Sequence, residues 1–219
     1  MKEQFLIKNE ACKQEFTVRQ KGYFYKLDFL EQYLYGHNGY IAGGCFKDIF
    51  LGKEVKDIDI FFRDQNDFND ALRYYNHVNW ELVYENQNAI SFKNPENGVR
   101  IELIKRVFGT PEYILSQFDF SICKFAYIKI NDDFSGISFG GVSGQNLISI
   151  YCNSYFEDIT QRKLSFDNSI VNPVQTFDRL LRYLHYGFIL DRESKSKLIN
   201  SIFSLETLNL DDLTDENYF

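Results

Sequence analysis

Two aspartates separated by one residue, Asp57 and Asp59 in the stretch DIDIFF, have types and spacing that suggest chemistry. Their alternation with isoleucines predicts a strand, on which both aspartates point to one face while Ile58 and Ile60 point to the core. Two neighbouring carboxylates repel each other, so they are suited to bind a hard divalent cation such as Mg²⁺. Two solvated aspartates at a strand edge would explain the same pattern without a metal.

A third carboxylate, Glu102, lies in VRIELI, where apolar and charged residues alternate. Val99, Ile101 and Leu103 then share the buried face of a strand, while Arg100 and Glu102 share the other face. If this strand neighbours the first one, Glu102 joins the two aspartates. Three carboxylates on adjacent strands can hold two metal ions roughly 3.5 to 4 Å apart, which is the arrangement for in-line phosphoryl transfer.

Two adjacent glycines, Gly43 and Gly44, precede the aspartates and open the segment GGCFKDIFLG. Residues without a Cβ let the backbone approach a phosphate closely, and the helix predicted after them offers unpaired N–H groups at its start. A glycine pair alone is weak evidence. Together with the carboxylates, it predicts one cleft with a phosphate side and a metal side.

The elements that must position these residues alternate along the chain. We predict a helix over 27–35, a short buried strand in GYIAGG, and a helix in CFKDIFLG that ends at Gly52. After the strand 57–63, a helix begins with Asn66 or Asp67 as its N-cap. Three short strands follow, in WELVYE, AISFKN and GVRIELIKR.

Helical patterns dominate the later part of the sequence. Thr110 and Pro111 give a strong helix start, and FDFSICKFAYIKI is apolar and extended, without a clear choice between strand and helix. From about residue 143 onward the pattern is helical. We therefore predict an α+β fold, with a mixed, mostly antiparallel sheet flanked by helices in 1–142 and a small helical C-terminal region in 143–219.

Bulk composition narrows the function classes. With 219 residues and a formal net charge of -7, the chain can form a large domain with a small appendage, but it lacks the basic excess of proteins that grip long nucleic acids. Its four cysteines are scattered without a CxxC pair, which disfavours a zinc site. The sequence has no signal-peptide or membrane-spanning pattern, so we expect a cytoplasmic protein with reduced thiols and no membrane partner.

The stretch GGCFKDIFLGKEVKDIDIFF resembles the signature of the DNA polymerase beta-like nucleotidyltransferase superfamily. It is most similar to the head domain of bacterial-type (class II) tRNA nucleotidyltransferases and poly(A) polymerases. FDFSICKFAY and RLLRYLHYGFIL are similar to two later motifs of that family, so the resemblance covers roughly residues 27–190. The matching residues are Gly43, Gly44, Lys47, Asp48, Leu51, Gly52, Asp57, Asp59, Asp119, Arg179 and Arg182.

The resemblance implies that residues 1–142 form a nucleotidyltransferase head that binds an NTP with Mg²⁺ or Mn²⁺. Glycines and a basic residue would cradle the β- and γ-phosphates, and an aspartate would lie beside the ribose. The implied nucleotide-binding residues are Gly43, Gly44, Cys45, Lys47, Asp119, Arg179 and Arg182, and the implied catalytic metal ligands are Asp57, Asp59 and Glu102.

Three positions depart from the family's pattern. Lys47 stands where the family has arginine, so a point charge replaces a bidentate phosphate contact. Phe118 replaces an arginine of the ribose-side motif, and Thr176 replaces an acidic residue that helps to read the incoming base. The family's tRNA enzymes also continue through body and tail domains, whereas this sequence ends at Phe219, so we expect no tRNA-elbow-binding domain.

The sequence thus favours a metal-dependent nucleotidyltransferase that transfers NMP from an NTP to an acceptor hydroxyl and releases pyrophosphate. The acceptor could be an RNA 3′ end, a protein or a small molecule. The alternative is a catalytically degenerate member of the fold, kept as a nucleotide-binding, protein-interaction or structural module. The acidic charge weighs against processive RNA extension without excluding a short RNA.

Overall fold

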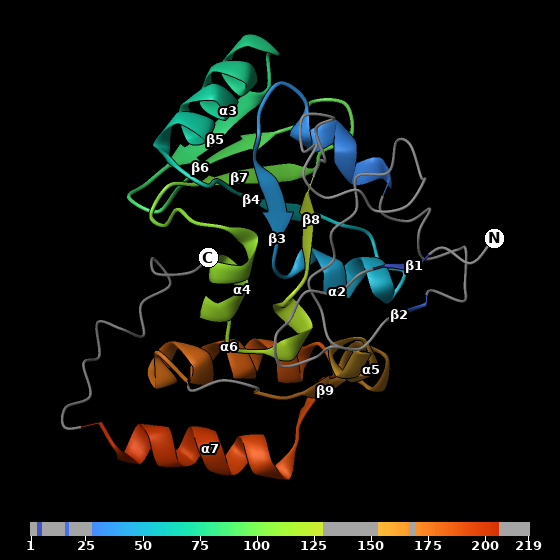
Figure 1. The fold of residues 1–219 in the computed structure, drawn as a ribbon, viewed down its shortest axis with the longest axis vertical. Coiled ribbons are helices and arrows are strands. Elements are labelled where there is room, and N and C mark those ends of the chain that lie inside the picture. Colours follow the sequence, from blue (N-terminus) through green and yellow to red (C-terminus); the bar gives the residue numbers. More distant parts are fainter. Residues whose placement is uncertain (1–3, 6–15, 18–27, 129–152, 167–169, 206–219) are drawn as a thin grey trace.

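A six-stranded sheet forms the centre of the protein (Figure 1). The computed structural model describes residues 4–5, 16–17, 28–128, 153–166 and 170–205. The strand order is β5-β6-β7-β4-β3-β8, with β4 and β7 parallel and every other neighbouring pair antiparallel. This confirms the mixed, mostly antiparallel sheet. The strands are β3 (Tyr40–Ala42), β4 (Asp57–Phe61), β5 (Glu81–Glu85), β6 (Ala89–Lys93), β7 (Arg100–Ile104) and β8 (Ala126–Ile128).

Strand β4 has the sidedness that its sequence predicts. Ile58 and Ile60 are fully buried in the larger of two hydrophobic clusters, while Asp57 is exposed. Strand β7 repeats the pattern, with Ile101 and Leu103 in the same cluster. Because alternate side chains point to opposite faces, both strands direct their charged residues away from this core.

Helices cover both faces of the sheet. The 3-10 helix η1 (Asp28–Leu34) and α3 (Gln65–His77) contribute to the larger core, and α4 (Pro111–Gln117) packs against the opposite face in a smaller cluster. The N-cap of α3 is Asp64, which accepts hydrogen bonds from two backbone amides, so the prediction of Asn66 or Asp67 was wrong. An aspartate accepting these N–H groups satisfies donors that have no partner inside the helix.

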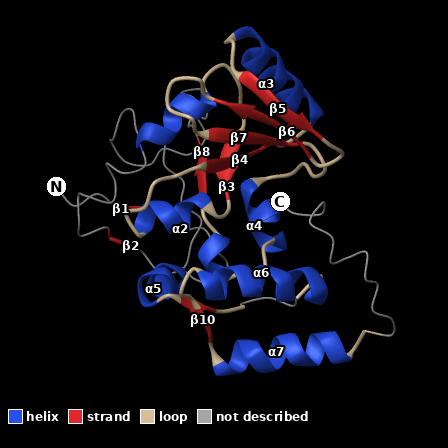
Figure 2. Cartoon of the chain, turned by 180° about the vertical axis from the view of Figure 1, so that it is seen from behind, coloured by secondary structure: helices blue, strands red, loops and turns tan. Residues whose placement is uncertain are grey.

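The C-terminal region lies below the sheet (Figure 2). It confirms the predicted helical character, although the boundary near residue 142 and the segment SGQNLISIYC lie mainly outside the described residues. Its two short strands pair in parallel, and a separate N-terminal pair is antiparallel. The elements are α5 (Asn153–Gln161), β9 (Lys163–Leu164), α6 (Pro173–His185), β10 (Ile189–Leu190), α7 (Arg192–Phe203), β1 (Gln4–Phe5) and β2 (Phe16–Thr17).

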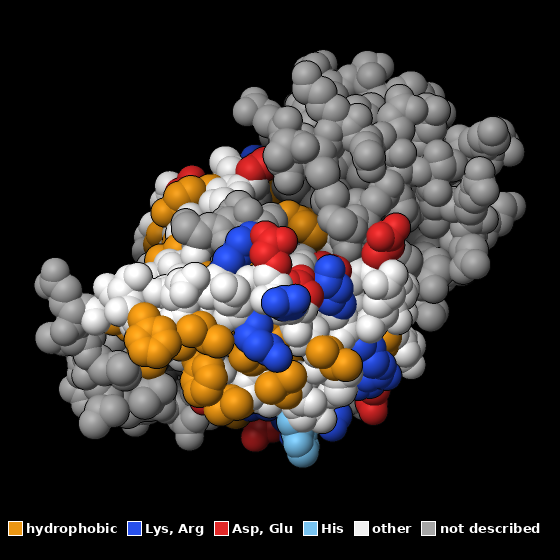
Figure 3. Space-filling view, turned by 90° about the horizontal axis from the view of Figure 1, so that it is seen from below, with side chains coloured by type: hydrophobic (Ala, Val, Ile, Leu, Met, Phe, Trp, Pro, Cys, Tyr) orange, Lys and Arg blue, Asp and Glu red, His pale blue; other side chains and the backbone are white. Residues whose placement is uncertain are grey.

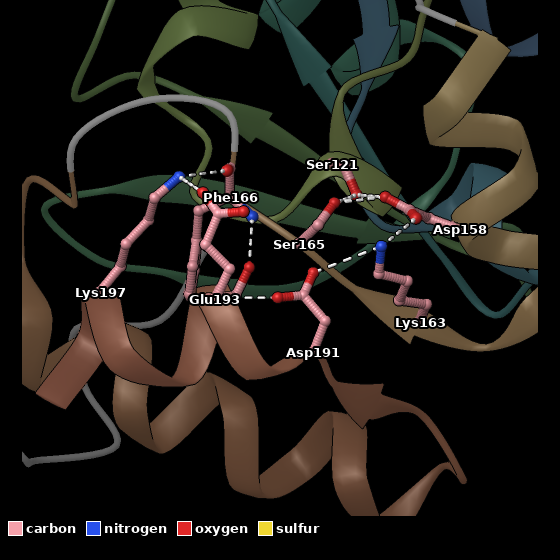
Figure 4. A network of polar contacts seen from close by, with 9 residues as sticks. Ser121, Asp158, Lys163, Ser165, Phe166, Asp191, Glu193 and Lys197 are labelled. Atoms are coloured by element: carbon pink, nitrogen blue, oxygen red, sulfur yellow. Dashed lines mark hydrogen bonds and ion pairs between the residues drawn. The ribbon is translucent and has the colours of Figure 1, made fainter.

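A buried polar network joins the two parts (Figure 4). Ser121, in the 3-10 helix η2 (Ser121–Cys123), donates to Asp158 of α5 at 2.6 Å, and Ser165 also donates to that carboxylate. Lys163 lies 3.9 Å from Asp158 and 3.4 Å from Asp191, which caps α7. Since Asp158 is almost fully buried, these bonds are needed to offset its lost hydration.

The outer faces of α6 and α7 carry apolar side chains. Seen from below, hydrophobic side chains gather beside a group of charged ones (Figure 3). None of the described helices is long and apolar enough to cross a bilayer, and the cytoplasmic location stays a prediction. The exposed large apolar residues of these two helices are Phe177, Leu181, Leu184, Ile199 and Phe203.

Candidate active site

A cleft of about 630 Å³ lies between α2 (Cys45–Phe50), the start of β4 and α6. Its walls carry charges of both signs. The charged lining residues are Lys47, Asp48, Lys53, Glu54, Lys56, Asp57, Asp59, Arg106, Asp119, Arg179 and Arg182. Most of the residues singled out in the sequence therefore face one hollow, although they come from segments more than 100 residues apart.

The three carboxylates lie on neighbouring parallel strands. Asp59 on β4 is in register with Glu102 on β7, and Asp57 is in register with Arg100. Side chains directly opposite each other on adjacent strands share a face of the sheet, so Glu102 lies beside the aspartates as expected. Only Asp57 and Asp59 line the cleft, however, because Glu102 sits one strand further from it.

Burial and repulsion change the acidity of this group. Burial, followed by the nearby charges of Glu102 and Asp57, raises the pKa of Asp59 to about 8. Burial also raises the pKa of Glu102, although a hydrogen bond with Tyr84 opposes that effect. Carboxylates that resist ionisation together are stabilised by a cation that neutralises them. The donor chemistry therefore fits a divalent metal ion.

Two other side chains hold the carboxylates apart. Nε of Arg100 donates to Oδ1 of Asp57 at 2.8 Å, and Tyr84 bonds to Glu102. As the side chains stand, no three His, Cys, Asp or Glu residues in the described part of the chain converge closely enough to hold a metal ion. Arg100 occupies Oδ1 of Asp57, and because that pair is half exposed, freeing this oxygen for a metal ion would cost only about 0 to 1 kcal/mol.

Gly43 makes the bend between β3 and the short helix α2. Its φ of 101° is one that residues with a side chain rarely adopt, and its amide donates to the Phe125 carbonyl at 3.3 Å. A Cβ at this position would lie 3.3 Å from Oδ2 of Asp59 and 3.5 Å from the Phe118 ring. Gly43 therefore leaves room for the Asp59 and Phe118 side chains but does not itself line the cleft, while Gly44 precedes α2 and does line it.

Lys47 is a buried cation in the cleft wall. Only 7 % of the residue is exposed, its Nζ lies 2.7 Å from Oδ1 of Asp48, and it stacks over the Tyr186 ring at 5.3 Å. These contacts fix a compact positive charge beside Cys45. Burial raises the pKa of the Cys45 thiol well above its usual range, so Cys45 contributes a neutral group to the cleft.

Asp119 connects α6 to the segment between α4 and η2. Its Oδ2 accepts from Nε of Arg179 at 2.9 Å and from the Thr176 hydroxyl at 2.9 Å, while its Oδ1 accepts from the Phe120 amide at 2.8 Å. The residue predicted to lie beside the ribose is thus occupied by protein donors. Thr176, which departs from the family's pattern, is one of those donors, and Arg182 is exposed at the cleft rim.

The structure brings in residues that the sequence did not single out for the site. Arg100 and Tyr84 engage the carboxylates, and alternation placed only Arg100 on the same face as Glu102. Arg106, just beyond the end of β7, also lines the cleft, and burial and the charge of Arg179 lower its pKa. Its position depends on where β7 ends relative to α6, which no local pattern encodes.

The fold of this chain is the polymerase beta-like nucleotidyltransferase fold found in the CCA-adding enzymes. The protein superposes on a CCA-adding enzyme in complex with CTP with a TM-score of 0.58 and 19 % identity, covering 83 % of this chain and 45 % of that one. The Thermotoga maritima CCA-adding enzyme complexed with tRNA superposes with a TM-score of 0.54 and 19 % identity, covering 83 % of this chain and 40 % of that one. At this identity the likeness establishes the fold, as the sequence motif predicted.

The chain belongs to the Gabija anti-defense 2 family, whose sequence profile matches residues 14–162. A relative from Bacillus phage SPbetaL7, described as Gabija anti-defense 2, is 22 % identical over 199 residues, which cover 90 % of this chain and 46 % of the relative. The chain therefore spans about half the length of this relative and of the CCA-adding enzymes.

Proposed function

We propose that this chain is a metal-dependent nucleotidyltransferase that moves NMP from an NTP to an acceptor hydroxyl. The observation that carries this proposal is the register of β4 and β7, which sets Glu102 beside Asp59 while both aspartates face the cleft. The nucleotidyltransferase fold supports the same reaction class. Neither the acceptor nor the preferred base follows from these observations.

Asp57, Asp59 and Glu102 would hold Mg²⁺ or Mn²⁺. When bound, the ions supply positive charge to the phosphoryl group during its transfer. Glu102, whose pKa is raised by burial, accepts the proton that the acceptor hydroxyl loses. The acceptor oxygen bonds to the α-phosphorus as the bond from that phosphorus to the bridging oxygen breaks, so pyrophosphate leaves with the bonding electrons.

The other wall of the cleft would bind the triphosphate. Lys47 and Gly44 both line this wall, and Gly43, just before them, leaves the Asp59 side chain unobstructed. Arg179 and Arg182 approach from α6. Because α2 has only six residues, we assign phosphate binding to these cations and not to a helix dipole.

The phage relative suggests where the reaction is used. Its description is Gabija anti-defense 2, and we infer that this chain acts against the same defence. The acceptor would then be a short RNA, a protein or a small molecule on which that defence depends. Plaque counts on cells that carry Gabija, with the chain expressed in its original form or as the double variant Asp57→Ala and Asp59→Ala, test whether the carboxylates are needed.

A degenerate binding module is the second candidate, and a specific observation favours it. Asp57 is paired with Arg100, and Asp119 with Arg179, so several charges of the cleft already have partners within the protein. A module of this kind would bind nucleotide or protein without releasing pyrophosphate. It would also protect phage when Asp57 and Asp59 are replaced.

Labelled ATP, CTP, GTP and UTP, incubated with the protein, Mn²⁺ and host RNA or lysate protein, test the reaction directly. We expect a labelled acceptor and pyrophosphate, both lost in the Asp57→Ala, Asp59→Ala variant and retained in Glu96→Gln, which changes an exposed turn carboxylate. The proposal fails if no NTP with Mn²⁺ raises the melting temperature, because binding to the folded state must stabilise it.

A further inference from the structure

A second groove of about 510 Å³ adjoins the cleft at Asp57. Glu54, Lys56 and Asp57 line both hollows. From this shared wall the cleft extends toward α2 and α6, whereas the groove extends across β7 and β6 to Val83 of the edge strand β5. The two hollows therefore lie on opposite sides of Asp57.

The groove follows one row of side chains across the sheet. Asp57 on β4 is opposite Arg100 on β7, and Arg100 is opposite Lys93 on β6. The next row on the same face of the sheet pairs Asp59 with Glu102. Glu102 lines neither hollow, so the groove meets the cleft at the start of β4, and none of the cations assigned to the triphosphate lines the groove.

The chemistry of the groove fits a phosphate-bearing ligand. Lys56, Lys93 and Arg100 supply three cations, and Val83 and Val99 give an apolar wall against which a sugar or base can pack. A volume near 510 Å³ suits a ligand the size of one or two nucleotides. The three cations outnumber the two carboxylates of the groove, Glu54 and Asp57, so it can hold a short anion, while the net charge of -7 disfavours long nucleic acid.

We propose that this groove is the acceptor subsite and that it takes a nucleotide-sized, phosphate-bearing acceptor with a free hydroxyl. The inference rests on the proposed function, since it places the NTP in the cleft and the acceptor in the groove. The source of the acceptor is a free nucleotide or the 3′ end of a short single strand, both of which present a phosphate and a hydroxyl.

Arg100 couples the groove to the metal ligands. Its Nε is bonded to Asp57 in the structure, and a phosphate in the groove competes for the same guanidinium. Since the Arg100–Asp57 pair is half exposed, moving Arg100 from Asp57 to a phosphate costs little free energy. Once Arg100 turns to the phosphate, Asp57 is available to a cation, so acceptor binding promotes metal binding.

The test measures binding of a fluorescein-labelled RNA trinucleotide with a free 3′ hydroxyl by anisotropy. Lys93→Ala and Arg100→Gln are each expected to weaken binding about five- to tenfold, and to reduce the salt dependence by roughly 0.7 per lost phosphate contact. Lys195→Ala, which removes an exposed cation from α7, is the matched control and should bind like the original protein. Equal binding by all four proteins overturns the proposal.

Two further arms separate the alternatives. If a nucleoside monophosphate displaces the trinucleotide, the free nucleotide is a sufficient ligand; if only oligonucleotides displace it, the strand end is required. A 20-nucleotide RNA that binds more than about tenfold tighter, with the gain retained in Lys93→Ala, contradicts a nucleotide-sized site. Transfer of label to a lysate protein that persists in Lys93→Ala and Arg100→Gln contradicts a phosphate-bearing acceptor.

Free Mn²⁺, followed by electron paramagnetic resonance, tests the coupling without turnover. Arg100→Gln is expected to bind Mn²⁺ about threefold tighter than the original protein when no RNA is present, because the exposed ion pair is gone. The trinucleotide should then raise the Mn²⁺ affinity only in the original protein. If NTP with Mn²⁺ raises the melting temperature of the original protein but Lys93→Ala and Arg100→Gln bind RNA and Mn²⁺ as the original does, the groove assignment alone is wrong. If NTP with Mn²⁺ does not raise that melting temperature, the proposed function itself fails.

Discussion

Replacing Arg179 by methionine should loosen the attachment of α6 to the segment that joins α4 to η2. The Asp119 side chain is 8 % exposed and that of Arg179 is 21 % exposed, and their closest approach is 2.7 Å. Methionine keeps much of the length of the arginine stem but removes its charge and donors. Asp119 would then keep only the Thr176 hydroxyl and the Phe120 amide as hydrogen-bond donors.

The cost follows from leaving a carboxylate buried with one partner removed. Breaking a fully buried ion pair in this way costs about 3 to 5 kcal/mol. Because a fifth of the Arg179 side chain reaches solvent and two donors to Asp119 remain, we expect roughly 2 to 3 kcal/mol. In a chain of this size that corresponds to a fall in melting temperature of about 4 to 12 °C.

The assay is thermal and urea unfolding of the metal-free protein, with Arg182→Met as the control. Arg182 lies on the same helix and lines the same cleft, but it is exposed. The double variant Arg179→Met, Asp119→Asn should recover at least half of the lost stability, since it removes the uncompensated charge. If Arg179→Met and Arg182→Met melt together, the ion pair does not hold α6 and the reasoning is refuted.

Three other outcomes are expected. Gly43→Ala should lower the free energy of unfolding by about 1 to 3 kcal/mol and weaken NTP binding, because its φ is 101° and its Cβ would meet Asp59. Folding raises the pKa of Asp59 from 3.8 to about 8, so between these values the carboxyl ionises in the unfolded chain but stays protonated in the folded one. In EDTA the free energy of unfolding should therefore fall as the pH rises from about 4 to 8, and Asp59→Asn should flatten that decline. Burial raises the pKa of Cys123 to about 11, so this thiol should resist alkylation at pH 8 until the protein unfolds.

Each of these outcomes has a matched comparison. Gly98 also has a positive φ, but a Cβ there meets nothing within 4 Å, so Gly98→Ala should cost less than Gly43→Ala. Equal losses in the free energy of unfolding would show that the added Cβ does not press on Asp59. Glu96→Gln should leave the pH dependence of melting unchanged, and the same result for Asp59→Asn would contradict a raised pKa. Peptide-level mass spectrometry that finds Cys123 alkylated in the folded protein would contradict its burial.

Local pattern was enough to predict most elements and the sidedness of the carboxylates. In β4, two-residue alternation separates Asp57 and Asp59 from Ile58 and Ile60 whatever the neighbouring strands are. The start of α4 was equally local, since Thr110 caps the helix that Pro111 begins. The N-cap of α3 was misplaced because Asp64, Asn66 and Asp67 all suit that position, and only the backbone geometry selects one.

The sequence by itself determined the type and order of the glycine and carboxylate motifs, because each is encoded within a few residues. Tertiary structure decided which charges meet. Parallel pairing of β4 and β7 sets Glu102 beside Asp59 and Arg100 beside Asp57, and the approach of α6 to the segment between α4 and η2 sets Arg179 on Asp119. These contacts join residues 43 to 60 positions apart, and no local periodicity carries that information.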